Sequence, residues 1–127
     1  MYGISIPAVL VAALATFIVG GPWYRIFGAT WRREANAHEM EKHPALVFAT
    51  AYVLSVIAAA LLAVWLGPET NWERGLTVGA SAGVAFVATS FGINYAFGGR
   101  SIKLFAIDGG YHVLQFAAFG LILGVWP

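Results

Sequence analysis

The sequence predicts an all-α membrane protein, a bundle of four transmembrane helices. Of its 127 residues, 60% are hydrophobic and 10% are charged, which is too apolar for the wetted surface of a small soluble domain. The apolar residues also gather in four stretches of about 20 residues, the length that an α-helix needs to cross a hydrocarbon core of about 30 Å. These stretches are 4–23, 45–66, 75–97 and 104–126. They nearly fill the chain, so we expect a single integral-membrane domain over residues 1–127.

The first stretch, 4–23, resembles a secretory signal in position only. It has no Lys or Arg before it and is longer than the apolar region of a signal, so we expect a retained helix. The loop that follows is rich in charge and helix formers from Trp31 to Lys42 and ends at Pro44. This composition predicts a short interfacial helix on the cytoplasmic face.

That loop also holds residue types that bind metals. They are Glu34, Glu39, Glu41, His38 and His43. The two histidines are five positions apart, whereas residues on one helical face are three or four apart, so we interpret the group as a solvated charged surface. We therefore expect no metal site and no cofactor.

The second stretch, 45–66, is apolar apart from Thr50, Tyr52 and Ser55, and the third, 75–97, carries a pattern. Its glycines repeat every fourth residue, which allows helix backbones to approach closely in lipid. At 100° per residue the same face continues into polar positions. The repeating glycines are Gly75, Gly79 and Gly83, and the predicted face comprises Gly79, Gly83, Ser90, Asn94 and Phe97. We therefore expect Asn94 to point toward protein.

In the fourth stretch, 104–126, Asp108, His112 and Gln115 follow i, i+4, i+7 spacing and share one face, and Ser101 precedes them as a candidate N-cap. An acid at a helix centre in hydrocarbon costs about 2.5 to 3.5 kcal/mol, so we expect a partner or a task for Asp108. Small residues occupy the opposite face, namely Gly109, Ala117, Gly120 and Gly124. A second close-packing face predicts a central helix or a subunit interface, and we favour a homo-oligomer.

The basic residues predict the orientation. Six of the seven lie in the first and third connections, namely Arg25, Arg32, Arg33, Lys42, Arg100 and Lys103, whereas Arg74 lies in the second. The positive-inside rule then places the first and third connections in the cytoplasm and both termini outside it. In a Gram-negative bacterium, this orientation puts both termini in the periplasm.

Three interpretations of the polar residues stay open. Asp108 and His112 could be structural partners of Asn94, Arg100 or Lys103. They could instead line a cytoplasm-facing pocket for a small polar ligand or a lipid headgroup, or form a proton or ion relay.

Two segments carry a family resemblance. Gly20-Gly21-Pro22-Trp23-Tyr24-Arg25-Ile26-Phe27-Gly28-Ala29-Thr30-Trp31 is the first. Asn94-Tyr95-Ala96-Phe97-Gly98-Gly99-Arg100, followed by Gly110-Tyr111-His112, is the second. Over essentially the whole chain, the sequence resembles a bacterial membrane family called domain of unknown function 1761. Gly99 departs from the acidic residue expected before the arginine. The resemblance implies a four-helix inner-membrane protein without an assigned activity, and it draws attention to Trp23, Tyr24, Asn94, Arg100 and His112.

The sequence does not indicate an enzyme, because it shows no nucleophile with a base, no metal-ligand spacing and no phosphate-binding loop. Nor does it show a basic patch for nucleic acid. The leading hypothesis is a small membrane protein that assembles with itself or with a larger complex and holds a ligand in a polar pocket. The alternative is a small transporter or proton-coupled carrier with a path between subunits. The candidate ligand-binding residues are Asn94, Arg100, Asp108, His112, Gln115, Trp23 and Tyr24.

Overall fold

The computed structural model describes residues 4–36 and 43–127, which are helical with short connections and contain no strand. The elements are α1 (Ile6–Ala13), α2 (Ala15–Ala35), α3 (Pro44–Leu66), α4 (Trp72–Ala82), η1 (Gly83–Ala88), α5 (Thr89–Gly98) and α6 (Ile102–Val125). α1 with α2, and α4 with η1 and α5, each form one long rod. These residues thus form four helices long and apolar enough to cross a membrane, as predicted.

The first rod is longer than its predicted span. α2 continues past Trp23 to Ala35 and ends where Asn36 takes a left-handed conformation with φ 52°. Residues 31–35 of the predicted interfacial helix are therefore the last turn of α2, because the charged segment continues the same helix. The rest of that prediction, including Glu39, Glu41 and His38, lies outside the described residues.

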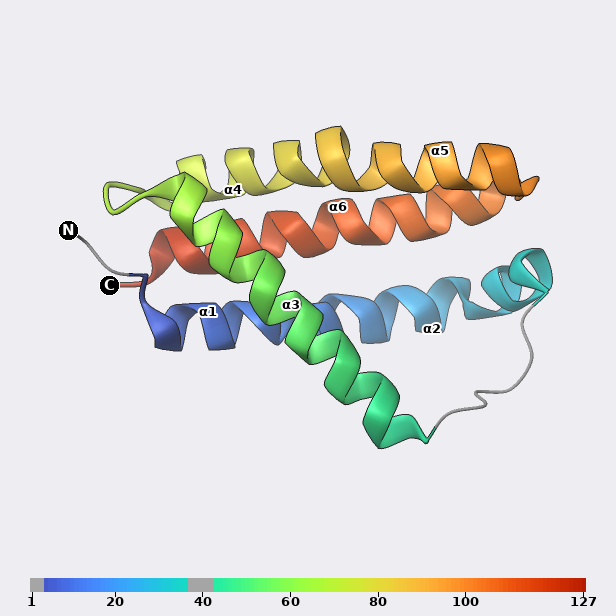
Figure 1. Cartoon of the computed structure of the whole chain (residues 1–127), viewed down its shortest axis with the longest axis horizontal. Coiled ribbons are helices and arrows are strands. Elements are labelled where there is room, and N and C mark those ends of the chain that lie inside the picture. The colour runs from blue at the N-terminus through green and yellow to red at the C-terminus, as the bar shows by residue number, and fades with distance from the viewer. Residues whose placement is uncertain (1–3, 37–42) are drawn as a thin grey trace.

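The four long helices are α1–α2, α3, α4–η1–α5 and α6, and we call each a rod. The rods run in alternating directions (Figure 1), and α6 lies at the centre of the bundle, in contact with every other element. Figure 1 shows the α4–η1–α5 rod along one side of α6 and the α1–α2 rod along the other. α3 crosses the bundle obliquely, so its Pro44 end stands away from the remaining helices. Ile4 and Pro127 line one shallow pocket, so the two ends of the described chain lie together.

Glycines bring α4 and α6 into backbone contact. A Cβ atom added to Gly75 would overlap the carbonyl oxygen of Gly120, and one added to Gly79 would overlap that of Phe116. Gly124 similarly approaches the backbone of Asn71. The predicted close packing of the third span is confirmed, and its partner is the second glycine face, on α6 of the same chain. Because both glycine faces are used here, they no longer argue for a subunit interface.

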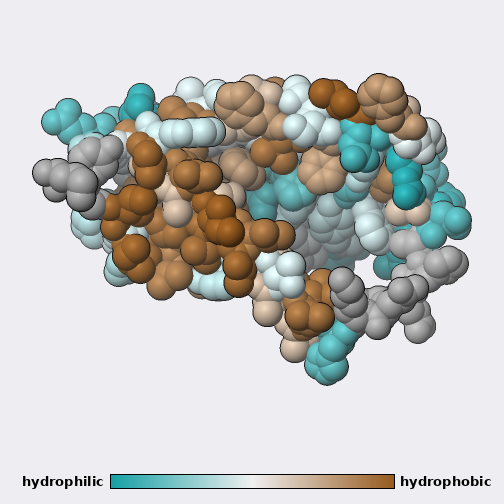
Figure 2. Space-filling model, viewed as in Figure 1, coloured by the Kyte–Doolittle hydropathy of each residue, from teal (hydrophilic) through white to brown (hydrophobic). Residues whose placement is uncertain are grey.

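The interior is apolar toward the termini and more polar toward the other end. One apolar cluster joins α1, the C-terminal half of α3 and the C-terminal half of α6. Its largest fully buried members are Phe119 and Leu62. In Figure 2, brown side chains surround the C-terminal half of α3, and teal and pale ones appear beside its diverging half.

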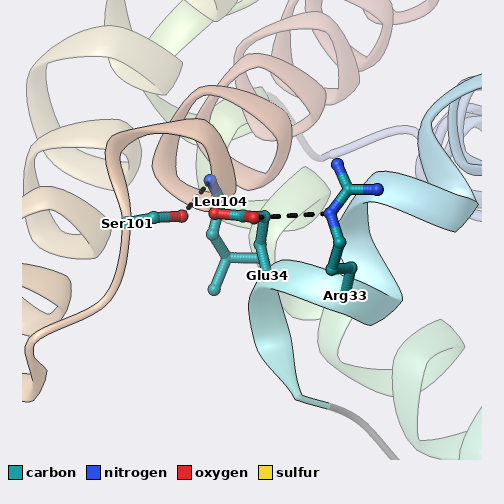
Figure 3. Close-up of polar contacts among 4 residues, drawn as sticks. All are labelled: Arg33, Glu34, Ser101 and Leu104. Carbon is teal, nitrogen blue, oxygen red and sulfur yellow. Dashed lines mark hydrogen bonds and ion pairs between the residues drawn. The ribbon is translucent and has the colours of Figure 1, made fainter.

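The end of α2 contacts the start of α6. Ser101 caps α6, as predicted, by accepting a hydrogen bond of 3.1 Å from the amide of Leu104. Figure 3 shows the Glu34 carboxylate between this turn and Arg33, whose Nε lies 3.7 Å from it. A carboxylate at a helix N-terminus is favourable because it faces the positive end of the helix dipole.

The rod of α4, η1 and α5 changes the face that it turns toward α6 in its middle, where η1 is a π-helix. A π turn accommodates about one extra residue, so the inward face shifts by about 100° beyond it. Phe91 and Tyr95 therefore point toward α6, where the Phe91 ring stacks on His112 and the Tyr95 hydroxyl donates to Asp108. Asn94 is exposed, so the prediction that it points toward protein is wrong. Phe97, on the same predicted face, is 93% exposed.

Candidate functional site

Asp108 is held by two phenols from different rods. The Tyr24 hydroxyl of α2 donates to Oδ1 at 2.6 Å, and the Tyr95 hydroxyl of α5 donates to Oδ2. The side chain is buried, with 7% exposure. We call Asp108, Tyr24 and Tyr95 the carboxylate cluster. It supplies hydrogen bonds to both carboxyl oxygens, which reduces the cost of burying the group.

Next to the cluster, Trp23 fixes α2 against α6. Its indole Nε1 donates to the carbonyl oxygen of Ile107 at 2.9 Å. A Cβ atom on Gly110 would come within 3.1 Å of the indole ring. The absence of a side chain at Gly110 thus allows α2 to approach α6 closely enough for Tyr24 to reach Asp108.

One helical turn further on, four side chains form a hydrogen-bonded chain across three helices. His112 Nδ1 lies 2.6 Å from Gln115 Oε1, and Gln115 Nε2 donates to Thr16 Oγ1 at 2.8 Å. Thr16 Oγ1 lies 2.5 Å from Ser55 Oγ. We call His112, Gln115, Thr16 and Ser55 the polar chain. It links α6 to α2 and α3 at the level where α3 begins to diverge.

Aromatic rings connect the cluster with the polar chain. The Tyr24 and Tyr111 rings meet edge to face at a centroid distance of 5.2 Å, and the Tyr111 and His112 rings at 4.7 Å. The Tyr111 hydroxyl donates to the Thr16 carbonyl at 2.8 Å. On its other side, the imidazole of His112 stacks on Phe91, with centroids 4.8 Å apart. The imidazole is thus positioned by rings from α5 and α6.

The divergence of α3 opens two adjoining pockets, of about 400 and 410 Å³. They share Thr16, Ala51 and Tyr111, and we call them together the hollow. All four members of the polar chain line the first pocket. The other lining residues are mostly apolar, namely Ala51, Leu54, Ala58, Val87 and Phe116 in the first pocket and Phe17, Gly20, Gly21, Val47 and Phe48 in the second. The hollow therefore combines apolar walls with one polar patch.

The structure brings five of the seven predicted site residues together. Trp23, Tyr24, Asp108, His112 and Gln115 follow one another along the contact between α2 and α6. The other two predicted positions lie elsewhere, in or after α5.

Asn94 lines a separate open pocket with Ser90, Phe91 and Tyr95. Arg100 donates from Nη1 to the carbonyl of Ala35 at 2.9 Å, which satisfies the C-terminal end of α2. Neither residue is hydrogen-bonded to Asp108, so the expected Arg100 and Asn94 partners of this acid are replaced by tyrosines.

Sequence reasoning missed Tyr95, Tyr111, Thr16 and Ser55 as site residues. Tyr95 could not be placed, because a regular helix puts its neighbour Asn94 on the inward face and nothing in the sequence marks the π turn. Thr16 and Ser55 are single hydroxyl residues within apolar stretches, and their partnership depends on the crossing of α2 and α3. Tyr111 was visible only as part of the family motif.

Fold and site together define an all-helical chain with four apolar rods and buried polar groups at one end. Residues 7–124 match the family described as a protein of unknown function (DUF1761), and the chain belongs to that family. No curated protein and no solved structure matches the chain. The family match therefore brings no activity, and function must be argued from the site.

Proposed function

We propose that this chain is an integral membrane protein that binds an amphipathic small molecule in the hollow between α2, α3 and α6. The observation that carries the proposal is the polar chain, which places hydrogen-bonding side chains at one patch of an otherwise apolar pocket. Ligand sites in proteins have this composition, with apolar walls and a few convergent polar groups. Such sites usually have a volume of about 300 to 1,000 Å³, and the two pockets of the hollow, of about 400 and 410 Å³, lie within this range.

The position of the hollow indicates where its occupant comes from. The hollow lies beside the diverging half of α3, whose side chains Leu46, Phe48 and Leu54 are more than half exposed. In a bilayer these side chains face hydrocarbon, and the hollow opens between helices to the same phase. A molecule with an apolar body and one polar group can enter from lipid and meet the polar chain.

Filling the hollow tests the proposal. Ala51 lines both pockets, and Ala51→Phe places a ring in the hollow while keeping the carbonyl that Ser55 contacts. Ala49→Phe is the matched control, because Ala49 is exposed on the same helix. We expect native mass spectrometry in lipid nanodiscs to find a retained small molecule on the wild type and on Ala49→Phe, and its loss from Ala51→Phe. Equal retention by all three proteins would contradict the proposal.

A proton-coupled carrier is the second candidate, favoured by the carboxylate cluster. Asp108 has two hydroxyl partners and no basic side chain among its hydrogen-bond partners in the described residues. Intramembrane acids of this kind mark proton pathways in many transporters. Proteoliposomes with an internal pH indicator distinguish the candidates: proton uptake by the wild type that Asp108→Asn abolishes favours transport, whereas identical traces from protein-containing and empty liposomes exclude it.

A further inference from the structure

The direction of each hydrogen bond in the polar chain can be assigned by starting at Ser55, the member furthest from His112 along the chain. Ser55 Oγ lies 2.7 Å from the carbonyl oxygen of Ala51, which can only accept, so the single hydroxyl proton of Ser55 points there. The contact of 2.5 Å between Ser55 and Thr16 then needs the proton of Thr16. Thr16 thus donates to Ser55 and must itself accept from Gln115.

The same reasoning extends from Thr16 through Gln115 to the imidazole of His112. Gln115 must present its NH₂ group to Thr16, at 2.8 Å, which leaves its Oε1 facing His112 Nδ1 at 2.6 Å. An amide oxygen can only accept, so Nδ1 carries a proton. In a neutral imidazole with its proton on Nδ1, Nε2 is an unprotonated acceptor.

The Nε2 atom of His112 is not fully enclosed by the described chain. It makes no hydrogen bond to a described residue, and within the described chain no buried side-chain nitrogen or oxygen lacks a partner, so this atom is accessible. His112 lines the first pocket of the hollow, and its ring is held by Phe91 and Gln115. The imidazole is therefore a fixed acceptor at the edge of the pocket.

We infer that the hollow binds lipid-soluble molecules whose polar group is a hydroxyl donor, with His112 Nε2 accepting that hydrogen bond. This inference rests on the proposed function and narrows it to one class of ligand, the long-chain or polycyclic alcohols. An ether or ester of the same body has no donor, so it leaves Nε2 unpaired. Sites in which the ligand covers an acceptor discriminate against such analogues, because the covered acceptor loses its solvent without a replacement hydrogen bond.

The tautomer is tested without any ligand. With His38→Gln and His43→Asn removing the other histidines, the ¹⁵N spectrum of the imidazole at neutral pH reports His112 alone. We expect the proton on Nδ1 and a bare Nε2. A proton on Nε2, either alone or with one on Nδ1, overturns the inference.

The ligand class is tested with hexadecanol and its methyl ether in nanodiscs. We expect the wild type to bind the alcohol roughly ten-fold more tightly than the ether, the difference of one hydrogen bond. His112→Gln can place an amide oxygen near the position of Nε2 and should keep the preference. His112→Asn can keep only the contact with Gln115 and should lose it.

The outcomes separate the two proposals. If the wild type binds both probes equally and Ala51→Phe abolishes both, the hollow is a ligand site without a hydroxyl preference, and only this inference fails. If His112→Asn keeps the ten-fold preference, the acceptor is another group and the inference also fails. If Ala51→Phe binds both probes as the wild type does, the proposed function fails as well.

Discussion

At the residue scale, the buried polar side chains of the described residues are hydrogen-bonded to neutral groups rather than to basic ones. The acid that stands alone in the fourth span accepts from two tyrosines, and the glutamine accepts from histidine and donates to threonine. Neutral donors satisfy a buried carboxyl group without burying a second charge, which avoids the desolvation penalty of an ion pair. Asp108 thus has polar partners, as the structural interpretation expects. They are Tyr95 of the third span and Tyr24 of the first, rather than Asn94 or Arg100.

Removing either phenol hydroxyl should destabilise the protein. We expect Tyr24→Phe and Tyr95→Phe each to lower the free energy of unfolding by about 1 to 2 kcal/mol, because one oxygen of buried Asp108 loses its donor. Tyr52→Phe is the control, since the Tyr52 hydroxyl donates to the neutral carbonyl of Leu10 at 2.8 Å and is exposed. Unfolding by heat or SDS in mild detergent measures the differences, and equal losses for all three variants would contradict the role of the carboxylate cluster.

At the scale of elements, the π-helix η1 decides which residues of α5 face the bundle. Without it, the face that begins at Gly79 and Gly83 would continue through Asn94. The extra residue brings Tyr95 to Asp108 instead. Helices that contain a π turn often do so at functional sites, where the turn aims a side chain that a regular helix would misplace.

Single deletions test this account. Deleting the exposed Val84 from η1 should yield a regular helix that still points Tyr95 inward, so the fold should be kept. Deleting the exposed Ile93 from α5 should rotate Tyr95 by about 100° and cost at least as much as Tyr95→Phe. Thermal unfolding compares the two. A larger loss for the Val84 deletion than for the Ile93 deletion would refute the phase argument.

The glycine contact between α4 and α6 is the second element-scale feature. Gly79→Ala should cost about 1 to 3 kcal/mol, because its Cβ meets the Phe116 carbonyl and the helices must separate. Gly28→Ala meets only the end of the Arg32 side chain, at 3.4 Å, and should be neutral or stabilising, because alanine favours helix. Chemical unfolding at two protein concentrations also shows whether the loss lies within one chain. A loss that depends on concentration would point to contacts between copies, and self-association stays a prediction.

At the scale of the whole molecule, one end is closed and the other is open. Alanine, leucine and phenylalanine side chains pack α1, α3 and α6 together near the termini, whereas α3 leaves the bundle at its Pro44 end. The polar chain lies at the point of divergence. This asymmetry makes a pocket from four helices that would otherwise form a solid bundle.

The alternating rods place both ends of the chain on one side, and the basic residues predict which side that is. Six of the seven lie in the first and third connections or beside them, so we expect both termini outside the cytoplasm. A fusion at Pro127 to a reporter that works only in the cytoplasm should be inactive, and a periplasmic reporter at the same site should be active. The reverse pattern would contradict the orientation.

The sequence by itself determined that the described residues hold four long apolar helices, the approximate ends of the last three, the glycine contact face of the third span and the need of Asp108 for polar partners. These properties follow from local composition and helical periodicity, which a chain carries wherever it folds. Among the five candidate site residues that the structure brings together, Asp108, His112 and Gln115 were visible because the cost of a polar group in an apolar span is itself a sequence signal. Trp23 and Tyr24 were named from the family resemblance.

Only the tertiary structure decided the partners. Tyr95 faces Asp108 because of a π turn that no residue pattern announces. Ser55 and Thr16 are neighbours because α3 crosses α2, and Gly120 and Gly124 pack against α4 rather than against a second copy. The hollow exists because α3 diverges. Each of these depends on how rods are placed against one another, and that placement is set by packing between segments far apart in the chain rather than by the residues of any one of them.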